Sequence, residues 1–172
     1  MIKLLGCIMI IFSTTVFGFN YGEKLKRRTK ELYEIQRCMC EIENQIIYTH
    51  TPLPDTLKNA AIKAKEPISS VLEQIYYMLE ENKVYSVYEA FKSAFSDKIE
   101  TLSLKDEDIT IIMDFSKSLG ESDVEGQRAI FSLATENIKK QIKISENVIK
   151  KNVKMYRCLG FSIGAVISIL LI

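Results

Sequence analysis

The fold is decided by the C-terminal part of the chain, SDVEGQRAIFSLATENIKKQIKISENVIKKNVKMYRCLGFSIGAVISILLI (residues 122–172). Its first four residues, Ser122 to Glu125, form a capping-box pattern, which predicts the start of a helix. From Gln127 to Leu159 no glycine or proline interrupts the chain, and apolar residues recur every three, four or seven positions. These apolar positions are Ile130, Ala134, Ile138, Ile142, Ile144, Val148, Ile149 and Met155. We therefore expect one long helix here.

Both ends of the chain are apolar. Residues 158–172 contain no charged side chain, and Leu4 to Phe19 is apolar apart from one serine and two threonines. We expect a transmembrane helix at each end, over residues 1–21 and 157–172, and a cytoplasmic helical domain over residues 22–156.

Basic residues lie on the inner side of each apolar segment. Residues 23–30, the first basic collar, contain five basic residues and one acidic residue, and residues 139–157, the second basic collar, contain seven and one. Because basic residues are retained on the cytoplasmic side of a membrane, we expect both collars to face the cytoplasm. The alternative is a signal peptide cleaved near Val16-Phe17-Gly18, which would make the chain an exported, C-terminally anchored surface protein.

The part between the collars, residues 31–138, is acidic. It contains twenty acidic and ten basic residues, a net charge of about −10. An acidic head disfavours nucleic acid as a partner and favours a basic protein surface. The collars themselves are expected to attract anionic lipid.

Within residues 22–156 the pattern indicates an all-α bundle of about six helices, of which the first and last continue into the two spans. A heptad-like apolar stripe extends the first helix to about Tyr48. The stripe consists of Leu25, Leu32, Ile35, Met39, Ile42 and Ile46. Pro52 then breaks the helix, and Pro54 is suited to the start of the next.

Three more helices follow. Pro67 begins one, and the capping box Ser86 to Glu89 begins another. A fifth begins near Leu104 and ends with a glycine cap at Gly120. The inner face of the fifth helix is predicted to consist of Ile109, Ile112, Met113 and Ser116.

No constellation for catalysis, cofactor binding or metal binding emerges. The chain has neither of the two glycine-rich phosphate-binding motifs, and its one histidine, His50, is interpreted as a surface or capping residue. Cys38 and Cys40 point to different faces of a helix and are interpreted as packing residues. The acidic group Asp106, Glu107, Asp108 and Asp114 is interpreted as helix-terminus charge. We therefore expect a protein that is not an enzyme.

Two polar corners are candidates for a partner interface. One runs from Leu119 to Gln127, and the other is the turn from Thr51 to Asp55. Their candidate residues are Gly120, Ser122, Asp123, Gln127, Pro52 and Pro54. The alternative is structural, because glycine, serine and aspartate are also what a helix-turn-helix corner needs.

Several short motifs in a fixed order resemble one family. Thr51-Pro52-Leu53-Pro54 and Leu119-Gly120-Glu121-Ser122-Asp123 followed by Gln127 lie between Lys3-Leu4-Leu5-Gly6 and Tyr156-Arg157-Cys158-Leu159-Gly160. In order, spacing and total length, the sequence resembles the stage III sporulation protein AB family of endospore-forming bacteria. That family's soluble region is similar to the helical F domain of type II secretion inner-membrane platforms.

The resemblance implies a function. It implies a component of the mother-cell channel complex that is needed for forespore development, located in the mother-cell membrane facing the forespore. The partners it implies are the cytoplasmic ATPase of the same operon and other membrane components of the complex. These partners follow from the resemblance alone, whereas periodicity and charge predict only the hairpin and the bundle.

Overall fold

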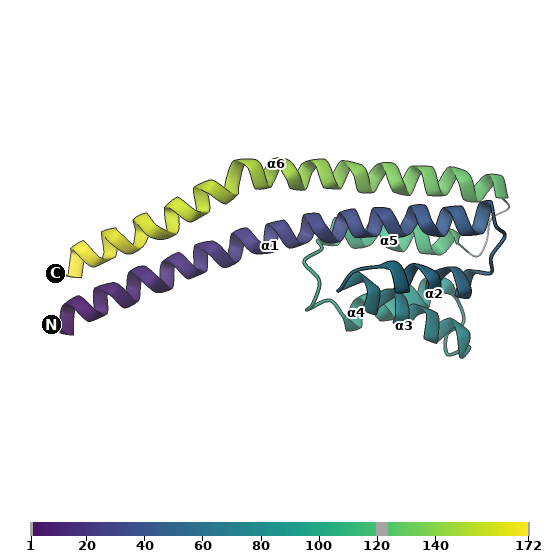
Figure 1. Cartoon of the computed structure of the whole chain (residues 1–172), viewed down its shortest axis with the longest axis horizontal. Helices are drawn as coiled ribbons and strands as arrows, with labels where there is room; N and C mark the ends of the chain where they lie inside the picture. Colours follow the sequence, from purple (N-terminus) through teal and green to yellow (C-terminus); the bar gives the residue numbers. More distant parts are fainter. Residues whose placement is uncertain (1, 120–123, 172) are drawn as a thin grey trace. The chain divides into compact units, whose positions relative to one another are not determined.

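The computed structural model describes residues 2–119 and 124–171, and it gives side chains for most of residues 22–151. Six helices occupy the described residues, and no strand occurs among them (Figure 1). The helices are α1 (Ile2–Ile47), α2 (Leu53–Lys63), α3 (Ile68–Glu80), α4 (Val87–Asp97), α5 (Asp106–Ser118) and α6 (Val124–Leu171). The expected all-helical fold is thus confirmed.

The chain divides into two compact units. The head consists of residues 30–142, and the stem consists of residues 1–29 and 143–172. α1 and α6 each contribute one part to the head and one part to the stem. The hydrophobic core lies in the head.

Proline and a left-handed residue end α1 and begin α2. His50 is exposed and has φ 52°, which turns the chain after α1. The Thr51 amide then donates to the Gln45 carbonyl at 2.9 Å. Pro52 precedes the first residue of α2, and Pro54 is the second residue of that helix, where the missing N–H has no intrahelical partner to lose. The predicted break and restart are confirmed, with α2 beginning one residue before Pro54.

The core of the head is built from one face of each helix. α2 packs against α3, α3 against α4, and α4 against α5. The buried apolar side chains are Leu32, Ile35, Cys38, Met39, Ile42 and Ile47 of α1; Leu57, Ala60 and Ala61 of α2; Ile68, Val71, Leu72 and Ile75 of α3; Ala90, Phe91, Ala94 and Phe95 of α4; Leu102; Ile112, Phe115 and Leu119 at α5; and Phe131, Ala134, Ile138 and Ile142 of α6. The predicted stripe on α1 is therefore confirmed at Leu32, Ile35, Met39 and Ile42, whereas Leu25 and Ile46 are only partly buried.

The buried face of α6 agrees with the predicted stripe at Ala134, Ile138 and Ile142 and differs from it at two positions. Ile144 was expected on the apolar stripe, yet it is 51% exposed, whereas Phe131 is 1% exposed and was absent from the prediction. The buried face runs through Phe131, Ala134, Ile138 and Ile142 at steps of three or four residues. Ile144 lies two residues beyond this face, about 200° around the helix, which places its side chain on the opposite side.

Phe131 joins α6 to α5. Its ring packs edge-on against the ring of Phe115, with 5.2 Å between the ring centroids. Such a pair contributes about 0.5–1.5 kcal/mol beyond the area that it buries. The inner face of α5 therefore includes Phe115, which the predicted set of Ile109, Ile112, Met113 and Ser116 omitted, and Ile109 and Met113 are only partly buried.

A polar network along the outside of the core fastens α1 to α2. Lys63 donates to the Glu41 carboxylate at 2.6 Å, and Gln45 donates to the same group at 2.7 Å. These hydrogen bonds lower the pKa of Glu41 below its ordinary value. Burial alone would raise the pKa of Glu34, but hydrogen bonds from Arg37 and from the backbone amide of Lys65 lower it. Both carboxylates therefore favour the folded state when they are ionised.

Two buried carboxylates hold the connection between α4 and α5. Glu31 of α1 is buried and accepts from the Ser103 amide at 2.7 Å. Asp108, in the first turn of α5, is fully buried and accepts from the Lys105 amide at 2.9 Å. Asp106 and Glu107 are exposed, as helix-terminus charges are expected to be, but Asp108 is a capping residue inside the protein.

The stem is joined by a buried hydroxyl pair. Thr29 Oγ1 of α1 lies 2.7 Å from Ser145 Oγ of α6 and also donates to the Leu25 carbonyl at 3.3 Å. The two hydroxyls thus share one hydrogen bond, in which either oxygen can be the donor. This hydrogen bond fixes which residues of the two helices face each other.

No helix among the residues searched in the described part of the chain combines the length and the apolar character needed to cross a membrane. The predicted spans, residues 1–21 and 157–172, fall where the structure gives helical backbone for residues 2–21 and 157–171 but no side chains. They stay predictions.

Candidate interaction groove

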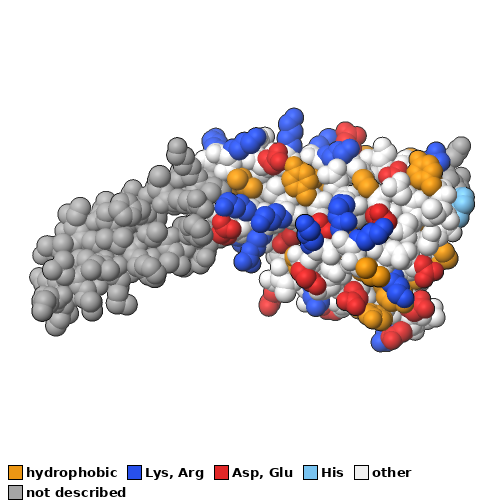
Figure 2. Space-filling model, in the orientation of Figure 1, with side chains coloured by type: hydrophobic (Ala, Val, Ile, Leu, Met, Phe, Trp, Pro, Cys, Tyr) orange, Lys and Arg blue, Asp and Glu red, His pale blue; other side chains and the backbone are white. Residues whose placement is uncertain are grey.

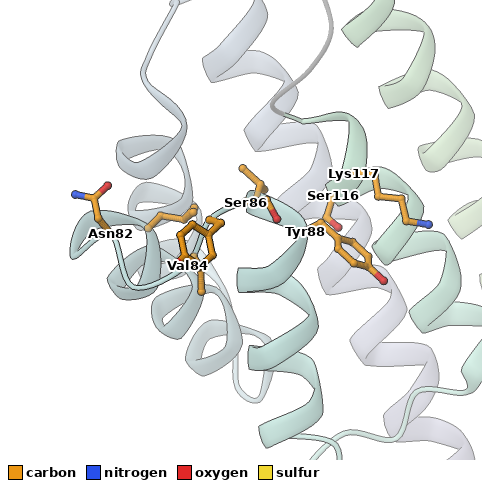
Figure 3. A pocket seen from close by; sticks show the side chains of 9 residues that line it. Asn82, Val84, Ser86, Tyr88, Ser116 and Lys117 are labelled. Carbon is orange, nitrogen blue, oxygen red and sulfur yellow. The ribbon is translucent and has the colours of Figure 1, made fainter.

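An open groove lies on the head between two segments that are distant in the sequence, residues 79–88 and the end of α5. It has a volume of about 700 Å³. Its walls are the connection from α3 to α4, the first residues of α4 and the last turn of α5 (Figure 3). The lining residues are Leu79, Asn82, Val84, Tyr85, Ser86, Val87, Tyr88, Ser116 and Lys117.

Local hydrogen bonds fix the wall between α3 and α4. Asn82 has φ 51°, a left-handed conformation that asparagine tolerates better than most residues. The Lys83 amide donates to the Met78 carbonyl at 2.9 Å, which closes the end of α3. The chain then runs through Val84 and Tyr85 into α4.

The predicted capping box begins α4. Ser86 Oγ accepts from the Glu89 amide at 3.2 Å. The Glu89 carboxylate accepts from the Tyr85 amide at 3.0 Å, one residue earlier than the usual reciprocal bond. The helix start is thus confirmed, and the same two bonds hold Tyr85 beside the groove.

Two tyrosines and one lysine give the groove its chemistry. Tyr85 is fully exposed, while Tyr88 is partly buried. The Lys117 ammonium lies 5.3 Å from the centre of the Tyr88 ring and 3.0 Å from Asp114. The hydrogen bond to Asp114 raises the pKa of Lys117 above its ordinary value. An aromatic ring and a carboxylate thus already hold one cation at this edge.

The hydrogen-bonding groups available to a ligand lie in the wall formed by the α3–α4 connection and the start of α4. Ser116 donates to the Met113 carbonyl at 2.8 Å and is therefore occupied. In the described part of the chain, the side-chain amide of Asn82 and the hydroxyls of Tyr85 and Tyr88 have no hydrogen-bond partner. The groove thus offers an amide and two phenol hydroxyls to a bound partner.

The predicted corner residues are only partly described. Gly120, Ser122 and Asp123 lie outside the described residues, and Gln127 belongs to α6 by its backbone but its side chain is not described. Their role in a corner or an interface stays a prediction. The groove includes Ser116 and Lys117, which shortly precede this corner in the sequence.

The second predicted corner is described and does not line the groove. Pro52 is exposed and Pro54 partly buried, and both lie at the start of α2. Thr49 and Thr51 join their hydroxyls at 2.7 Å, and Thr56 donates to the Thr51 carbonyl at 3.3 Å. These bonds give the turn a structural role.

The groove tyrosines were missed by sequence reasoning. The signal was present: Val84, Tyr85, Val87 and Tyr88 crowd apolar side chains around a helix cap, where a loop would ordinarily be polar. The same segment contains Asn82, a residue type that often reverses the chain. What the sequence could not supply was the opposite wall, because Lys117 comes from a helix almost thirty residues later.

Of the two described cysteines, Cys38 has the predicted packing role, whereas Cys40 does not belong to the core. Cys38 is buried and Cys40 is partly exposed, and both are free thiols. Burial raises the pKa of the Cys38 thiol to about 12, so this thiol is inert at neutral pH. Among the described residues, no group of three or more potential ligands is placed to hold a metal ion.

Comparison with known proteins gives the family. The family model for stage III sporulation protein AB matches residues 3–172. The stage III sporulation protein AB of Bacillus subtilis (strain 168) is 28% identical over 171 residues, which cover 99% of each chain. A solved structure of a stage III sporulation protein AB superposes with a TM-score of 0.67 at 22% identity, covering 72% of this chain and 97% of that one, and it supports the fold. The chain therefore belongs to the stage III sporulation protein AB family.

Proposed function

We propose that this chain is a non-enzymatic, membrane-anchored component of the sporulation channel complex, and that its head is a platform or adaptor for a cytoplasmic ATPase. In this proposal residues 1–21 and 157–172 are the two spans. They lie in the mother-cell membrane that faces the forespore, and the head lies in the cytoplasm with the other membrane components of the complex around it.

The groove of the head is the observation that carries the proposal. Tyrosine is enriched at the energetically important centres of protein interfaces, and the groove presents two tyrosines on a rigid helical frame. The hydroxyls of Tyr85 and Tyr88 are open to a partner's hydrogen-bonding groups, and the hydrogen bonds around Ser86 hold the backbone in place. A partner would therefore meet a surface that loses little conformational freedom on binding.

Charge favours a basic protein surface as the partner. Residues 31–138 carry a net charge of about −10. Acidic side chains adjoin the groove in sequence on each wall: Glu80 and Glu81 precede Asn82, Glu89 follows Tyr88, and Asp114 precedes Lys117. A protein with a basic surface would be drawn to the head and oriented toward the groove.

Site-specific photocrosslinking tests this proposal. A photoreactive phenylalanine replaces Tyr85 in the full-length protein in sporulating cells, and the same residue replaces Tyr33 as the control, because Tyr33 is a tyrosine of the same bundle and is 48% exposed. We expect the ATPase to crosslink at position 85 and not at position 33. Absence of the ATPase at position 85, or equal crosslinking at both positions, would refute the groove as its docking site.

A further inference from the structure

The described part of the stem exposes a set of cations on two joined helices. Lys24 and Arg27 project from α1, and Lys143, Lys150 and Lys151 project from α6; all five are exposed. Figure 2 shows basic side chains projecting into solvent from the long helices. These five residues are called the stem cations below.

The stem cations lie on one structural unit. The buried contact between Thr29 and Ser145, at 2.7 Å, joins the two helices at the edge of the stem. Lys24 and Arg27 are three residues apart and so share a face of α1, and Lys143 and Lys150 are seven apart and share a face of α6. The helical rise spreads these groups over roughly 5 Å on α1 and roughly 10 Å on α6.

The stem cations are also uncommitted. Among the described residues, none of them forms an ion pair, whereas their neighbour Lys26 pairs with Glu23 at 2.7 Å and Lys140 pairs with Glu136 at 3.6 Å. Exposed like charges at this density repel one another and therefore favour an anionic ligand that spans several of them.

The position of the stem cations decides what that ligand is. Lys24 and Arg27 lie three and six residues after the proposed span 1–21, and Lys150 and Lys151 lie seven and six residues before the proposed span 157–172. The helical rise places these four within roughly 10 Å of the spans, near the level of lipid phosphates, whereas Lys143 lies roughly 21 Å away. The arginine can bind a phosphate through two parallel hydrogen bonds, and the lysines supply point charges.

We propose that four of the stem cations, Lys24, Arg27, Lys150 and Lys151, bind the anionic headgroups of phospholipids. This proposal rests on the two-span anchorage in the proposed function and goes beyond it, because it assigns a ligand to four named side chains. Bound lipid would neutralise the repulsion between the collars and hold the end of the stem at a fixed depth in the membrane.

Lipid selectivity of the full-length protein tests this assignment. The protein is reconstituted in phosphatidylcholine bilayers, and its association with spin-labelled phosphatidylglycerol is compared with that of spin-labelled phosphatidylcholine. We expect a preference of about fivefold for phosphatidylglycerol, the factor that one basic residue near a surface supplies. The preference should fall at high ionic strength, because salt screens exposed charges.

Two matched variants separate the stem cations from charge in general. One variant carries K24Q, R27Q, K150Q and K151Q. The control carries K58Q, K65Q, K92Q and R128Q, which remove the same numbers of lysines and arginines from exposed positions of the head. We expect the first variant to lose the preference and the control to keep it, with equal helical content by circular dichroism.

The possible outcomes distinguish lipid binding from anchorage. A protein that inserts, as judged by resistance to alkaline extraction, but shows no preference would overturn the lipid proposal and leave the anchorage intact. Equal loss of preference in both variants would also overturn it. A protein that alkaline treatment extracts would instead overturn the anchorage on which the proposal rests.

Discussion

Replacing Phe131 with alanine tests how α6 is seated on the head. The Phe131 side chain is 1% exposed, and its ring packs edge-on against Phe115 at 5.2 Å between centroids. Removing a buried phenylalanine to alanine costs about 3–5 kcal/mol, because the transfer free energy of the ring is lost and a cavity is left. For a chain of 172 residues this corresponds to a fall in melting temperature of roughly 6–20 °C.

The assay is thermal unfolding of the full-length protein in one detergent, followed by far-ultraviolet circular dichroism. The matched control is L133A, since Leu133 lies two residues further along α6 and is 62% exposed. We expect this control to change the free energy of unfolding by no more than about 0.5 kcal/mol. A double-mutant cycle with F115L and F131L should give a coupling free energy of about 0.5–1.5 kcal/mol for the ring pair.

The reasoning would be refuted if L133A, rather than F131A, caused the large loss of stability. If L133A destabilised the protein as much as F131A, the buried face of α6 would be rotated from the one described here. A small loss of stability in F131A, together with a large loss when the buried Ile138 is replaced by alanine, would mean that α5 and α6 do not pack through the two rings.

Three further predictions concern the thiols, a carboxylate and the stem hydroxyls. At pH 8 we expect Cys40 to be alkylated much faster than Cys38, whose thiol is buried with its pKa raised to about 12, as measured by peptide mass spectrometry. The pKa of Glu41 is lowered in the folded state, so the stabilisation from its ionised carboxylate is present above the ordinary pKa of 4.5 and is lost as the pH falls through the lower folded value. E41Q should therefore reduce the dependence of the free energy of unfolding on acid pH, by less than about 1 kcal/mol, as measured by thermal unfolding at several pH values. T29V should cost about 1–3 kcal/mol in thermal unfolding by leaving the buried Ser145 hydroxyl without its partner, and adding S145A should recover part of that cost.

Each of these predictions has a contrary result. Equal alkylation rates for the two thiols would place Cys38 at the surface. An unchanged acid transition in E41Q would mean that the Glu41 carboxylate does not stabilise the packing of α1 against α2. A T29V S145A double variant as unstable as the sum of the two single variants would show that the hydroxyls act independently.

Much of the fold could be predicted because local chemistry and periodicity agree. Prolines marked the start of α2, a capping box marked the start of α4, and the apolar stripe of α1 became the core seam. At these positions the backbone preference and the hydrophobic pattern indicate the same structure, which is the condition for a reliable prediction.

The rest depended on packing between distant segments. Ile144 fits an apolar series in the sequence, but the partner surface selects Phe131 and the residues three or four positions apart that follow it. Asp108 reads as a solvated helix-terminus charge, and only the approach of other elements makes it a buried cap. The groove is of the same kind, because Tyr88 and Lys117 become neighbours only when α4 and α5 pack together.

The measurement that tests the central claim most directly is affinity capture of the crosslinked, C-terminally tagged full-length protein from sporulating cells, together with its intact mass. The account predicts that the captured protein retains residues 1–18 and that a cytoplasmic ATPase is captured with it. A mass lacking residues 1–18, with only surface or envelope proteins captured, would contradict both the two-span topology and the platform function.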